Sequence, residues 1–188
     1  MTTLAFRRAT DADIPLLVEL VTASYRGEAS RTGWTTEADL LDGARIDTEQ
    51  LATDIHRPQS LVLLGEEDGR TLACAHVAVE DGAGYFGMFS VWPQLQGRGL
   101  GKAMLAEAER IAREELLQSR MRMTVIDVRD ELIAWYQRRG YRRTGIHKPF
   151  PYGDERFGIP RRPDLRFEVL EKPLSALPGP IRFATRVI

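Results

Sequence analysis

The segment from residue 85 to residue 114 most constrains the fold, because a strand pattern leads through a glycine-rich turn into a helix pattern. Residues 85–91 are apolar and strand-like. The apolar residues of the following segment recur at helical spacing, at Leu100, Met104, Ala108, Ile111 and Ala112. The turn between them holds Gly97, Gly99 and Gly101, and glycine lets a backbone turn sharply and approach a ligand closely. Because amides at the start of a helix attract anions, the pattern predicts a phosphate-binding turn.

Two well-known phosphate-binding turns do not fit this sequence. The nucleotide-binding P-loop needs a glycine five positions before the glycine of its Gly-Lys pair and a hydroxyl residue after the lysine. Here Gln96 and Ala103 occupy those places. The dinucleotide pattern G-x-G-x-x-G also fails, since its third glycine would fall on a lysine or a methionine. What remains is Gln96-x-x-Gly99-x-Gly101, for which a plain turn without a ligand is the alternative.

The remaining pattern resembles the Q/R-x-x-G-x-G/A signature of the GCN5-related N-acetyltransferases (the GNAT family), which hold the pyrophosphate of acetyl-CoA on those amides. In a second motif, Tyr136, Arg138, Gly140 and Tyr141 match the order and spacing of Y-x-K-x-G-F in that family. The resemblance covers residues 4–170. It implies a GNAT-like acyl-CoA N-acyltransferase fold of the α/β class, with a central mixed, mostly antiparallel sheet and helices on both faces.

Length and composition agree with a compact enzyme domain. With 188 residues, 43% hydrophobic and 28% charged, the chain is an ordinary globular protein of one domain. We expect a single GNAT-like domain over residues 1–172 and a C-terminal tail of undefined role over residues 173–188. The formal net charge of −1 offers no overall attraction to nucleic acid or to a membrane, so neither is expected as a partner. The single cysteine and the absence of a secretory signal lead us to expect a cytoplasmic location.

The chain alternates between strand-like and helix-like segments. Thr10 and Asp13 predict a helix start, with Pro15 in the first turn. Further helices are expected over residues 37–41, 48–55, 99–114 and 131–139, with a loop over residues 27–35. Strands are expected over residues 4–7, 61–65, 71–79, 85–91, 121–128, 141–146 and 165–170. Hairpins followed by a strand–helix–strand unit predict a mixed sheet with helices on both faces.

Transfer of an acetyl group to an amine releases a CoA thiolate, which a general acid can protonate. The resemblance assigns this role to Tyr136, whose phenol, with a pKa of about 10, is protonated at neutral pH. An amphipathic core tyrosine is the alternative. The resemblance also implies that backbone amides near residues 89–91 polarise the thioester carbonyl. The predicted cofactor-binding residues are Phe89, Val91, Gln96, Gly97, Arg98, Gly99, Gly101 and Lys102, although Arg98 and Lys102 could equally be solvated surface charges.

Two features depart from the family pattern. Many relatives have an Asn seven residues before the tyrosine, whereas this chain has Arg129, which cannot accept a hydrogen bond. Arg129 is therefore not counted as a cofactor ligand. Some relatives also place a glutamate base on the strand before the turn, and here that strand carries no carboxylate. Our candidate for the base, or for a substrate contact, is Glu28. Glu80, Asp81 and His76 acting through water are alternatives, and His76 is more typical of a hydrogen-bonded core histidine.

Acceptor specificity in this fold usually comes from the loop after the first helix and from late loops, so Tyr25 and Trp34 are candidate substrate contacts. We predict an acetyl-CoA-dependent N-acetyltransferase that moves the acetyl group directly to a primary amine of a small molecule. No metal is expected, because the three histidines are far apart in sequence and lack cysteine partners. A non-catalytic acyl-CoA-binding module of the same fold is the alternative. A homodimer through the C-terminal strand or the tail is a further expectation.

Overall fold

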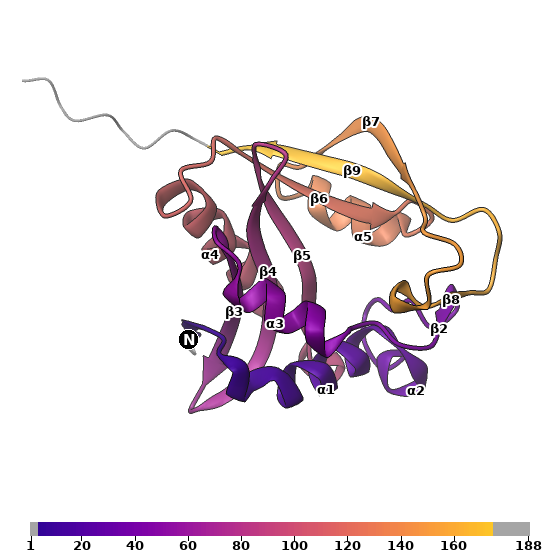
Figure 1. Cartoon of the computed structure of the whole chain (residues 1–188), viewed down its shortest axis with the longest axis horizontal. Coiled ribbons are helices and arrows are strands. Elements are labelled where there is room, and N and C mark those ends of the chain that lie inside the picture. Colours follow the sequence, from indigo (N-terminus) through magenta and orange to yellow (C-terminus); the bar gives the residue numbers. More distant parts are fainter. Residues whose placement is uncertain (1–3, 175–188) are drawn as a thin grey trace, which may run out of the picture.

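A seven-stranded sheet forms the centre of the computed structural model, which describes residues 4–174 (Figure 1). Its strands are β1 (Ala5–Arg8), β3 (Ser60–Glu67), β4 (Arg70–Glu80), β5 (Ala83–Val91), β6 (Arg120–Ile126), β7 (Arg142–Pro149) and β9 (Arg166–Pro173). The helices are α1 (Ile14–Tyr25), α2 (Gly27–Ser30), α3 (Thr48–His56), α4 (Leu100–Glu114) and α5 (Asp130–Gln137). Two short strands, β2 (Leu41–Asp42) and β8 (Ile159–Pro160), pair with each other outside the main sheet.

The strand order of the main sheet is β1-β3-β4-β5-β6-β9-β7. Every neighbouring pair is antiparallel except β5 and β6, which are parallel and connected through α4. The predicted mixed, mostly antiparallel sheet is therefore confirmed. Its one parallel pair is the strand–helix–strand unit that contains the glycine turn.

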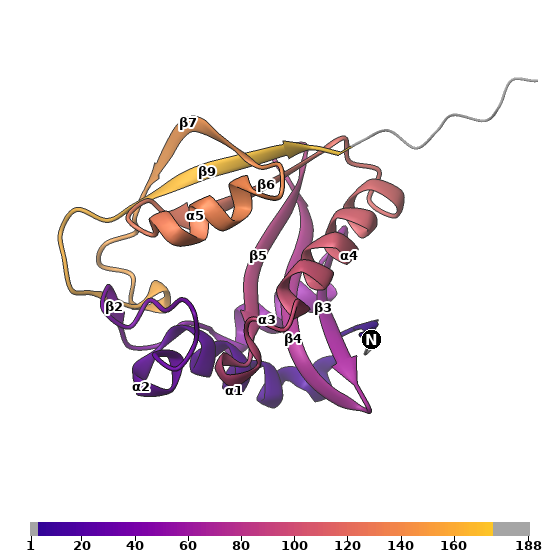
Figure 2. The ribbon, with the colours of Figure 1, turned by 180° about the vertical axis from the view of Figure 1, so that it is seen from behind.

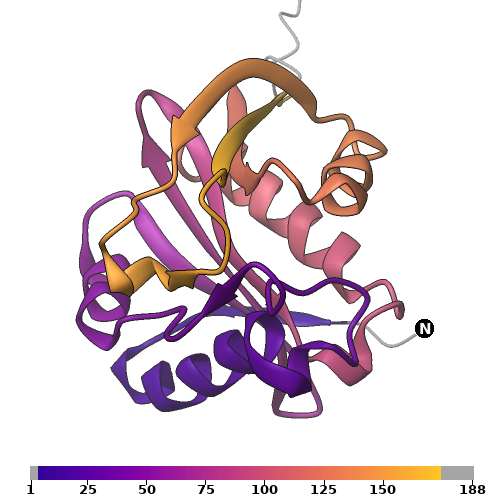
Figure 3. The ribbon, with the colours of Figure 1, turned by 90° about the vertical axis from the view of Figure 1, so that its right-hand side faces the viewer.

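Different helices cover the two faces of the sheet (Figure 3). On one face, α1 and α3 bury Leu17, Leu20, Val21 and Leu51 against strand residues such as Leu64. On the other face, α4 buries its stripe of apolar side chains, which consists of Met104, Leu105, Ala108, Ile111 and Ala112. Helix α5 packs into the same cluster. The helical spacing read from the sequence thus gives the buried face of α4.

The parallel strands β5 and β6 separate soon after they meet. They pair only at Gly84 with Met121 and at Tyr85 with Arg122, and then diverge (Figure 2). Strand β5 also contains a bulge, where the register with β4 shifts and Met88 takes a φ of +49°. A bulge bends its strand and leaves one residue out of the regular ladder. Strand β5 therefore both diverges from β6 and contains the bulge, immediately before the glycine turn.

Two local predictions are wrong. No helix forms over residues 37–41: the amides of Leu40 and Leu41 both donate to Glu37 O at 2.9 Å, which makes a single turn, and Leu41 then enters β2. The partner of β2 is β8, more than a hundred residues later, so local spacing could not reveal this pairing. The expected loop over residues 27–35 begins with the short helix α2.

The C-terminal strand β9 lies inside the sheet, paired with β6 on one side and β7 on the other. Within this sheet β9 has no free edge, because β7 forms the edge. The homodimer stays a prediction. Leu174 is buried in the core just beyond β9, two residues past the predicted domain boundary. The rest of the predicted tail, residues 175–188, lies outside the described residues. Within residues 4–174, no helix is long and apolar enough to cross a membrane.

Candidate active site

Two cavities lie along the divergent strands. The larger, of about 590 Å³, is bounded by the end of β5, the glycine turn, and residues of α4 and α5. The smaller, of about 220 Å³, lies between β5 and β6 and reaches Phe157 in a late loop. Five residues line both cavities, namely Tyr25, Phe89, Arg129, Leu132 and Tyr136. The two cavities therefore meet at these side chains.

The glycine turn forms one wall of the larger cavity. Gly97 and Gly99 both have a φ of +84°, a left-handed conformation that favours glycine. Gly99 is the N-cap of α4. The first amides of a helix have no intrahelical partner, and in α4 no side chain caps them either. At Gly101 a Cβ would lie 3.0 Å from Phe89 Cζ, which is tighter than ordinary contact. Basic side chains complete this wall: Lys102, Arg138 and Arg139.

The Gln96 side chain connects the turn to the loop after α2. Its Oε1 accepts a hydrogen bond from the Trp34 amide at 2.6 Å, and its Nε2 donates to Val91 O at 3.2 Å. Gly33 also lies against this amide, since a Cβ there would be 2.8 Å from Gln96 Oε1. Gln96 thus connects the end of β5 to the loop after α2 and stabilises the glycine turn.

Carbonyl groups near the bulge of β5 accept hydrogen bonds from α1. The Tyr25 hydroxyl donates to Phe89 O at 2.6 Å, and Ser24 Oγ donates to Val91 O at 3.1 Å. These contacts fix the backbone of residues 89–91 at the junction of the cavities. Tyr25 is half-buried at this junction, and burial raises the pKa of its phenol.

Tyr136 lies on α5 and faces both cavities. Aromatic rings hold it in place, with centroids 5.1 Å away at Trp135, 5.8 Å at Tyr141 and 6.5 Å at Phe86. The neighbouring Tyr141 hydroxyl donates to Glu109 at 3.0 Å, whereas no described residue bonds the Tyr136 hydroxyl. Burial raises the pKa of Tyr136 well above the usual value. Tyr136 is therefore a protonated phenol that lines both cavities.

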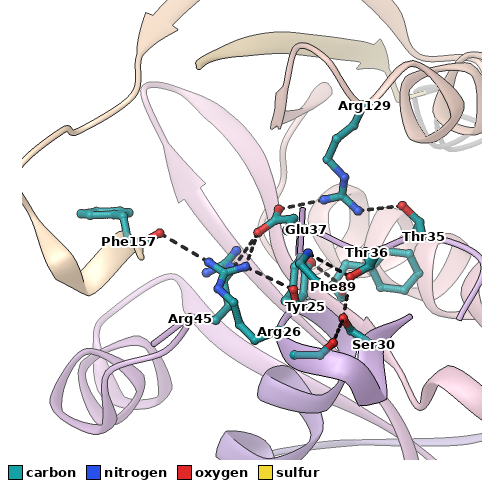
Figure 4. Close-up of polar contacts among 12 residues, drawn as sticks. Tyr25, Arg26, Ser30, Thr35, Thr36, Glu37, Arg45, Phe89, Arg129 and Phe157 are labelled. Atoms are coloured by element: carbon teal, nitrogen blue, oxygen red, sulfur yellow. Dashed lines mark hydrogen bonds and ion pairs between the residues drawn. The ribbon is translucent and has the colours of Figure 1, made fainter. Parts of the chain in front are cut away.

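A buried carboxylate, Glu37, lies among three arginines at the wall of the smaller cavity (Figure 4). Arg26 Nη1 donates to Glu37 Oε2 at 2.7 Å, and Arg129 Nη1 donates to Oε1 at 2.8 Å. Arg45 Nε lies 3.9 Å from Oε2. Burial alone would raise the pKa of Glu37, but Arg129, Arg45 and Arg26 outweigh burial and hold the pKa below its usual range. Glu37 is therefore ionised and a weak base.

The sequence did not single out Glu37 or Arg45. Their importance comes from contacts across the fold, because Arg26 follows α1, Arg129 precedes α5, and Glu37 and Arg45 flank β2. In the sequence, the departure from the family pattern at Arg129 was the only sign of this cluster. Arg129 also donates a second hydrogen bond, from Nη2 to Thr35 Oγ1 at 2.8 Å, two residues before Glu37. Arg129 thus pairs with Glu37, and it also lines the larger cavity.

Most of the predicted cofactor-binding residues line the larger cavity: Phe89, Val91, Gln96, Gly97, Gly99, Gly101 and Lys102. Arg98 does not line this cavity. Its side chain is half exposed, and its Nη2 lies 3.8 Å from Glu67. The predicted substrate contacts Tyr25 and Trp34 also line the larger cavity, and Tyr25 lines the smaller one as well. That these residues bind a cofactor or a substrate stays a prediction.

The carboxylates proposed as bases lie elsewhere. The Glu28 side chain is 91% exposed, pairs with Arg31 Nε at 3.0 Å, and lines neither cavity. Glu80 pairs with Arg57 at 2.9 Å at the far end of β4, and Asp81 is exposed in the following turn. Among the described residues that line the two cavities, Glu37 is the one carboxylate.

His76 and Cys74 are buried in β4 and line neither cavity. His76 Nε2 shares a hydrogen bond of 2.8 Å with Ser60 Oγ, and burial lowers the pKa of the imidazole to about 4. Burial raises the pKa of the Cys74 thiol to about 12, so the thiolate that a nucleophile requires does not form near neutral pH. His76 thus has the hydrogen-bonded core role that the sequence favoured, and Cys74 is a buried core residue.

Comparison with known proteins identifies the family. A sequence profile of the Acetyltransferase (GNAT) family matches residues 19–141, a span that includes the glycine turn, α5 and Tyr136. The chain therefore belongs to the GNAT family of acetyltransferases, as its two motifs predicted. No curated protein matches the chain.

Solved structures of acetyltransferases share the whole fold. The ribosomal-protein-S18-alanine N-acetyltransferase from Escherichia coli is 15% identical with a TM-score of 0.67, and the match covers 96% of this chain and 100% of that one. IAA acetyltransferase from Bacillus cereus is 18% identical with a TM-score of 0.62, over 92% and 100%. The protein yncA from Salmonella typhimurium, solved with its cofactor acetyl-CoA, is 19% identical with a TM-score of 0.64, over 94% and 97%. At these identities the likeness establishes the fold alone.

Proposed function

We propose that this protein is an acetyl-CoA-dependent N-acetyltransferase that acts on a primary amine of a small molecule in the cytoplasm, with Tyr136 as the general acid. The observation that carries the proposal is the junction of the two cavities at Tyr136 and Phe89. In this proposal, the larger cavity holds the acetyl donor and the smaller cavity holds the amine. Donor and acceptor would then meet beside the Tyr136 hydroxyl.

The backbone amides and basic side chains of the larger cavity support acetyl-CoA as its ligand. The uncapped amides at the start of α4 can donate to the diphosphate, as expected for an anion at a helix N-terminus. Lys102, Arg138 and Arg139 lie on the same wall and can neutralise phosphate charge. The Arg139 guanidinium is stacked 3.4 Å from the centroid of Trp135 and is therefore already oriented. When bound, acetyl-CoA supplies an activated acetyl group.

The residues at the junction supply what acyl transfer requires. The amine nitrogen forms a bond to the acetyl carbon, the bond from that carbon to sulfur breaks, and the Tyr136 phenol gives its proton to the sulfur that leaves. The nitrogen loses one proton to solvent, and the Tyr136 phenolate regains one from solvent. Backbone groups fixed at residues 89–91 would stabilise the negative charge that develops on the carbonyl oxygen, and such contacts commonly contribute about 3 kcal/mol. The proposed transfer is direct, and the position of the one cysteine supports this, since Cys74 is buried and lines neither cavity.

Thermal denaturation with acetyl-CoA, CoA and ATP side by side tests the donor site. At ligand near 100 times Kd, binding to the native state stabilises it by about 2.7 kcal/mol. Each kcal/mol raises Tm by about 2–4 °C for a domain of this size. We expect a rise of several degrees with acetyl-CoA and CoA and none with ATP. No rise with either thioester or thiol at saturating ligand would contradict the proposal.

Gly99→Ala should weaken acetyl-CoA binding, because an L-residue at this left-handed position strains the turn that carries the amides. We expect Kd, measured by calorimetry, to rise about tenfold or more, which corresponds to about 1.4 kcal/mol. The matched control is Gly69→Ala, since Gly69 also has a positive φ and open space within 4 Å of where a Cβ would stand, but lies in the β3–β4 turn. Both variants should lose stability, and the control should keep its affinity. Equal affinities of the two variants for acetyl-CoA would contradict binding of the diphosphate by the amides of this turn.

The pH profile should have no descending limb up to about pH 10. Tyr136 acts in its protonated form, and burial raises its pKa, so alkaline solution does not remove the acid. The rate should rise with pH as the acceptor amine becomes neutral. His76 adds no step between pH 5 and 8, because its pKa is lowered to about 4. Steady-state kinetics across this range check the prediction, and a decline of kcat beginning near pH 8 would contradict it.

A non-catalytic acyl-CoA-binding module is the second candidate. It is favoured by the state of Glu37, the one carboxylate on the described cavity walls, which is paired with arginines and poorly suited to accept a proton. This candidate predicts acetyl-CoA binding without amine-dependent release of CoA thiol. The two functions therefore differ in a single assay.

A further inference from the structure

The acceptor side of the site carries an excess of positive charge. Three guanidinium groups surround one carboxylate, and the side chains of Arg26, Glu37 and Arg129 are 5%, 7% and 9% exposed. Among the described residues on either cavity wall, no second carboxylate is present to balance them. Three guanidinium groups share a single carboxylate, so the cluster has a net positive charge, which favours an anionic ligand.

Arg45 is the arginine best placed to meet such a ligand. It lines the smaller cavity, and its side chain is 30% exposed. Its one ion pair within the described residues is the long contact of 3.9 Å to Glu37, whereas Arg26 and Arg129 make short ones. The guanidinium is held 4.7 Å from the centroid of Tyr25. An oriented arginine with donors to spare is suited to bidentate binding of a carboxylate.

A ligand held at Arg45 would lie beside the reacting groups. Tyr25, which supports Arg45, lines both cavities, and Arg129 does so as well, with its guanidinium 5.9 Å from the same ring. Arg129 Nε is also buried without a hydrogen-bond partner. The anion-binding side of the smaller cavity is therefore continuous with the junction at Tyr136.

The remaining walls of the smaller cavity are apolar. They consist mainly of large hydrophobic side chains: Leu41, Phe86, Met88, Met123, Val125, Ile126, Phe150, Phe157 and Phe167. A volume of about 220 Å³ suits a molecule of the size of a single amino acid. A polyamine would add positive charge beside Arg45 and Arg129, where the net charge is already positive.

We propose that the acceptor is an amine that carries a carboxylate and an apolar side chain, as an α-amino acid does, and that Arg45 binds the carboxylate. This inference rests on the proposed function, since it assigns the smaller cavity to the acceptor. It gives the Glu37 cluster a role in specificity, in which Glu37 orients the arginines and the acceptor supplies the missing negative charge.

The first test measures binding without catalysis. The probes are 3-phenylpropionate and its uncharged amide, 3-phenylpropanamide, titrated by NMR into the full chain with saturating CoA. We expect the acid to bind about tenfold tighter or better, because hydrogen bonds to a charged group contribute about 1.5–3 kcal/mol. Arg45→Gln should abolish the preference, and Arg45→Lys should retain part of it. The matched control is Arg57→Gln, since the Arg57 side chain is also 30% exposed but lines neither cavity.

The second test measures thiol release with three acceptors: L-phenylalanine, L-phenylalaninamide and 2-phenylethylamine. The amide is less basic than the amino acid and the amine is more basic, so a preference for the amino acid over both cannot come from basicity. We expect kcat/KM for L-phenylalanine to exceed both by about tenfold or more, and Arg45→Gln to remove this advantage. Because Arg45 does not touch the donor cavity, the variant should bind acetyl-CoA as the wild type does.

The outcomes separate this inference from the proposed function. Equal affinity for the acid and its amide, or a preference that survives Arg45→Gln, would overturn carboxylate recognition. Faster transfer to 2-phenylethylamine than to L-phenylalanine would also overturn it, while leaving the acetyltransferase intact. A carboxylate preference in binding with no thiol release from any amine would support the anion site and contradict the acetyltransferase.

Discussion

Replacing Tyr136 by phenylalanine is expected to lower kcat by about 10²–10³-fold, within the range of general acid–base catalysis. The hydroxyl is the group that would protonate the leaving sulfur, and no described residue holds it by a hydrogen bond. The ring would remain packed against Trp135, Tyr141 and Phe86, so the fold should persist. The Kd for acetyl-CoA should change little. Pre-steady-state and steady-state rates of thiol release, together with calorimetry, check this prediction.

Tyr141→Phe is the matched control for this experiment. Tyr141 belongs to the same motif and is buried, but its hydroxyl is bound to Glu109 and it lines neither cavity. This variant should lose a little stability and keep kcat within about twofold, since a net hydrogen bond contributes about 1 kcal/mol to folding. If Tyr136→Phe kept the wild-type kcat across the pH range, Tyr136 would be a packing residue and the assigned acid would be wrong.

Glu37→Ala is expected to destabilise the protein by about 3–5 kcal/mol, because removing one partner leaves the buried arginines uncompensated. The corresponding fall in Tm is about 6–20 °C. The effect should depend on pH. The lowered pKa of Glu37 means that its contribution is complete above the ordinary carboxyl pKa and is lost as pH falls through the folded value. Thermal denaturation from pH 8 downward should therefore bring the wild type closer to the variant.

Asp42→Ala provides the comparison for Glu37→Ala. Asp42 also pairs with an arginine through short contacts, to Arg161 at 2.6 and 2.7 Å, but the two side chains are 51% and 48% exposed. An exposed pair is screened by water and contributes little to folding, so this variant should lose little stability. Equal losses in the two variants would show that the Glu37 cluster is not a buried charge centre.

The parts of the site that the sequence predicts are those built from neighbouring residues. The spacing of Gln96, Gly99 and Gly101, and of Tyr136 and Tyr141, lies within short segments whose conformation is set locally. The glycine turn, the stripe of α4 and the class of fold could therefore be recognised from the order of the amino acids. The positive φ of Gly99 is the physical reason that a glycine stands there.

The Glu37 cluster could not be predicted in this way. Its members come from the end of α1, the segment around β2 and the turn before α5, and only the folded chain brings them together. The sequence suggests Glu28 as the base or a substrate contact, because Glu28 lies in the loop after the first helix. Its side chain is exposed to solvent and pairs with Arg31. The bulge at Met88 could not be predicted for another reason. Methionine seldom adopts a positive φ, so its presence in the sequence does not indicate a bulge.

Release of CoA thiol from acetyl-CoA, measured with and without a panel of amines and amino acids, tests the central claim most directly. The proposed enzyme should release thiol only when an amine is present, with mass spectrometry detecting one acetylated amine for each thiol, and Tyr136→Phe should suppress the release. Binding of acetyl-CoA without amine-dependent thiol release, on folded protein at pH 8–9, would contradict the account and identify a binding module.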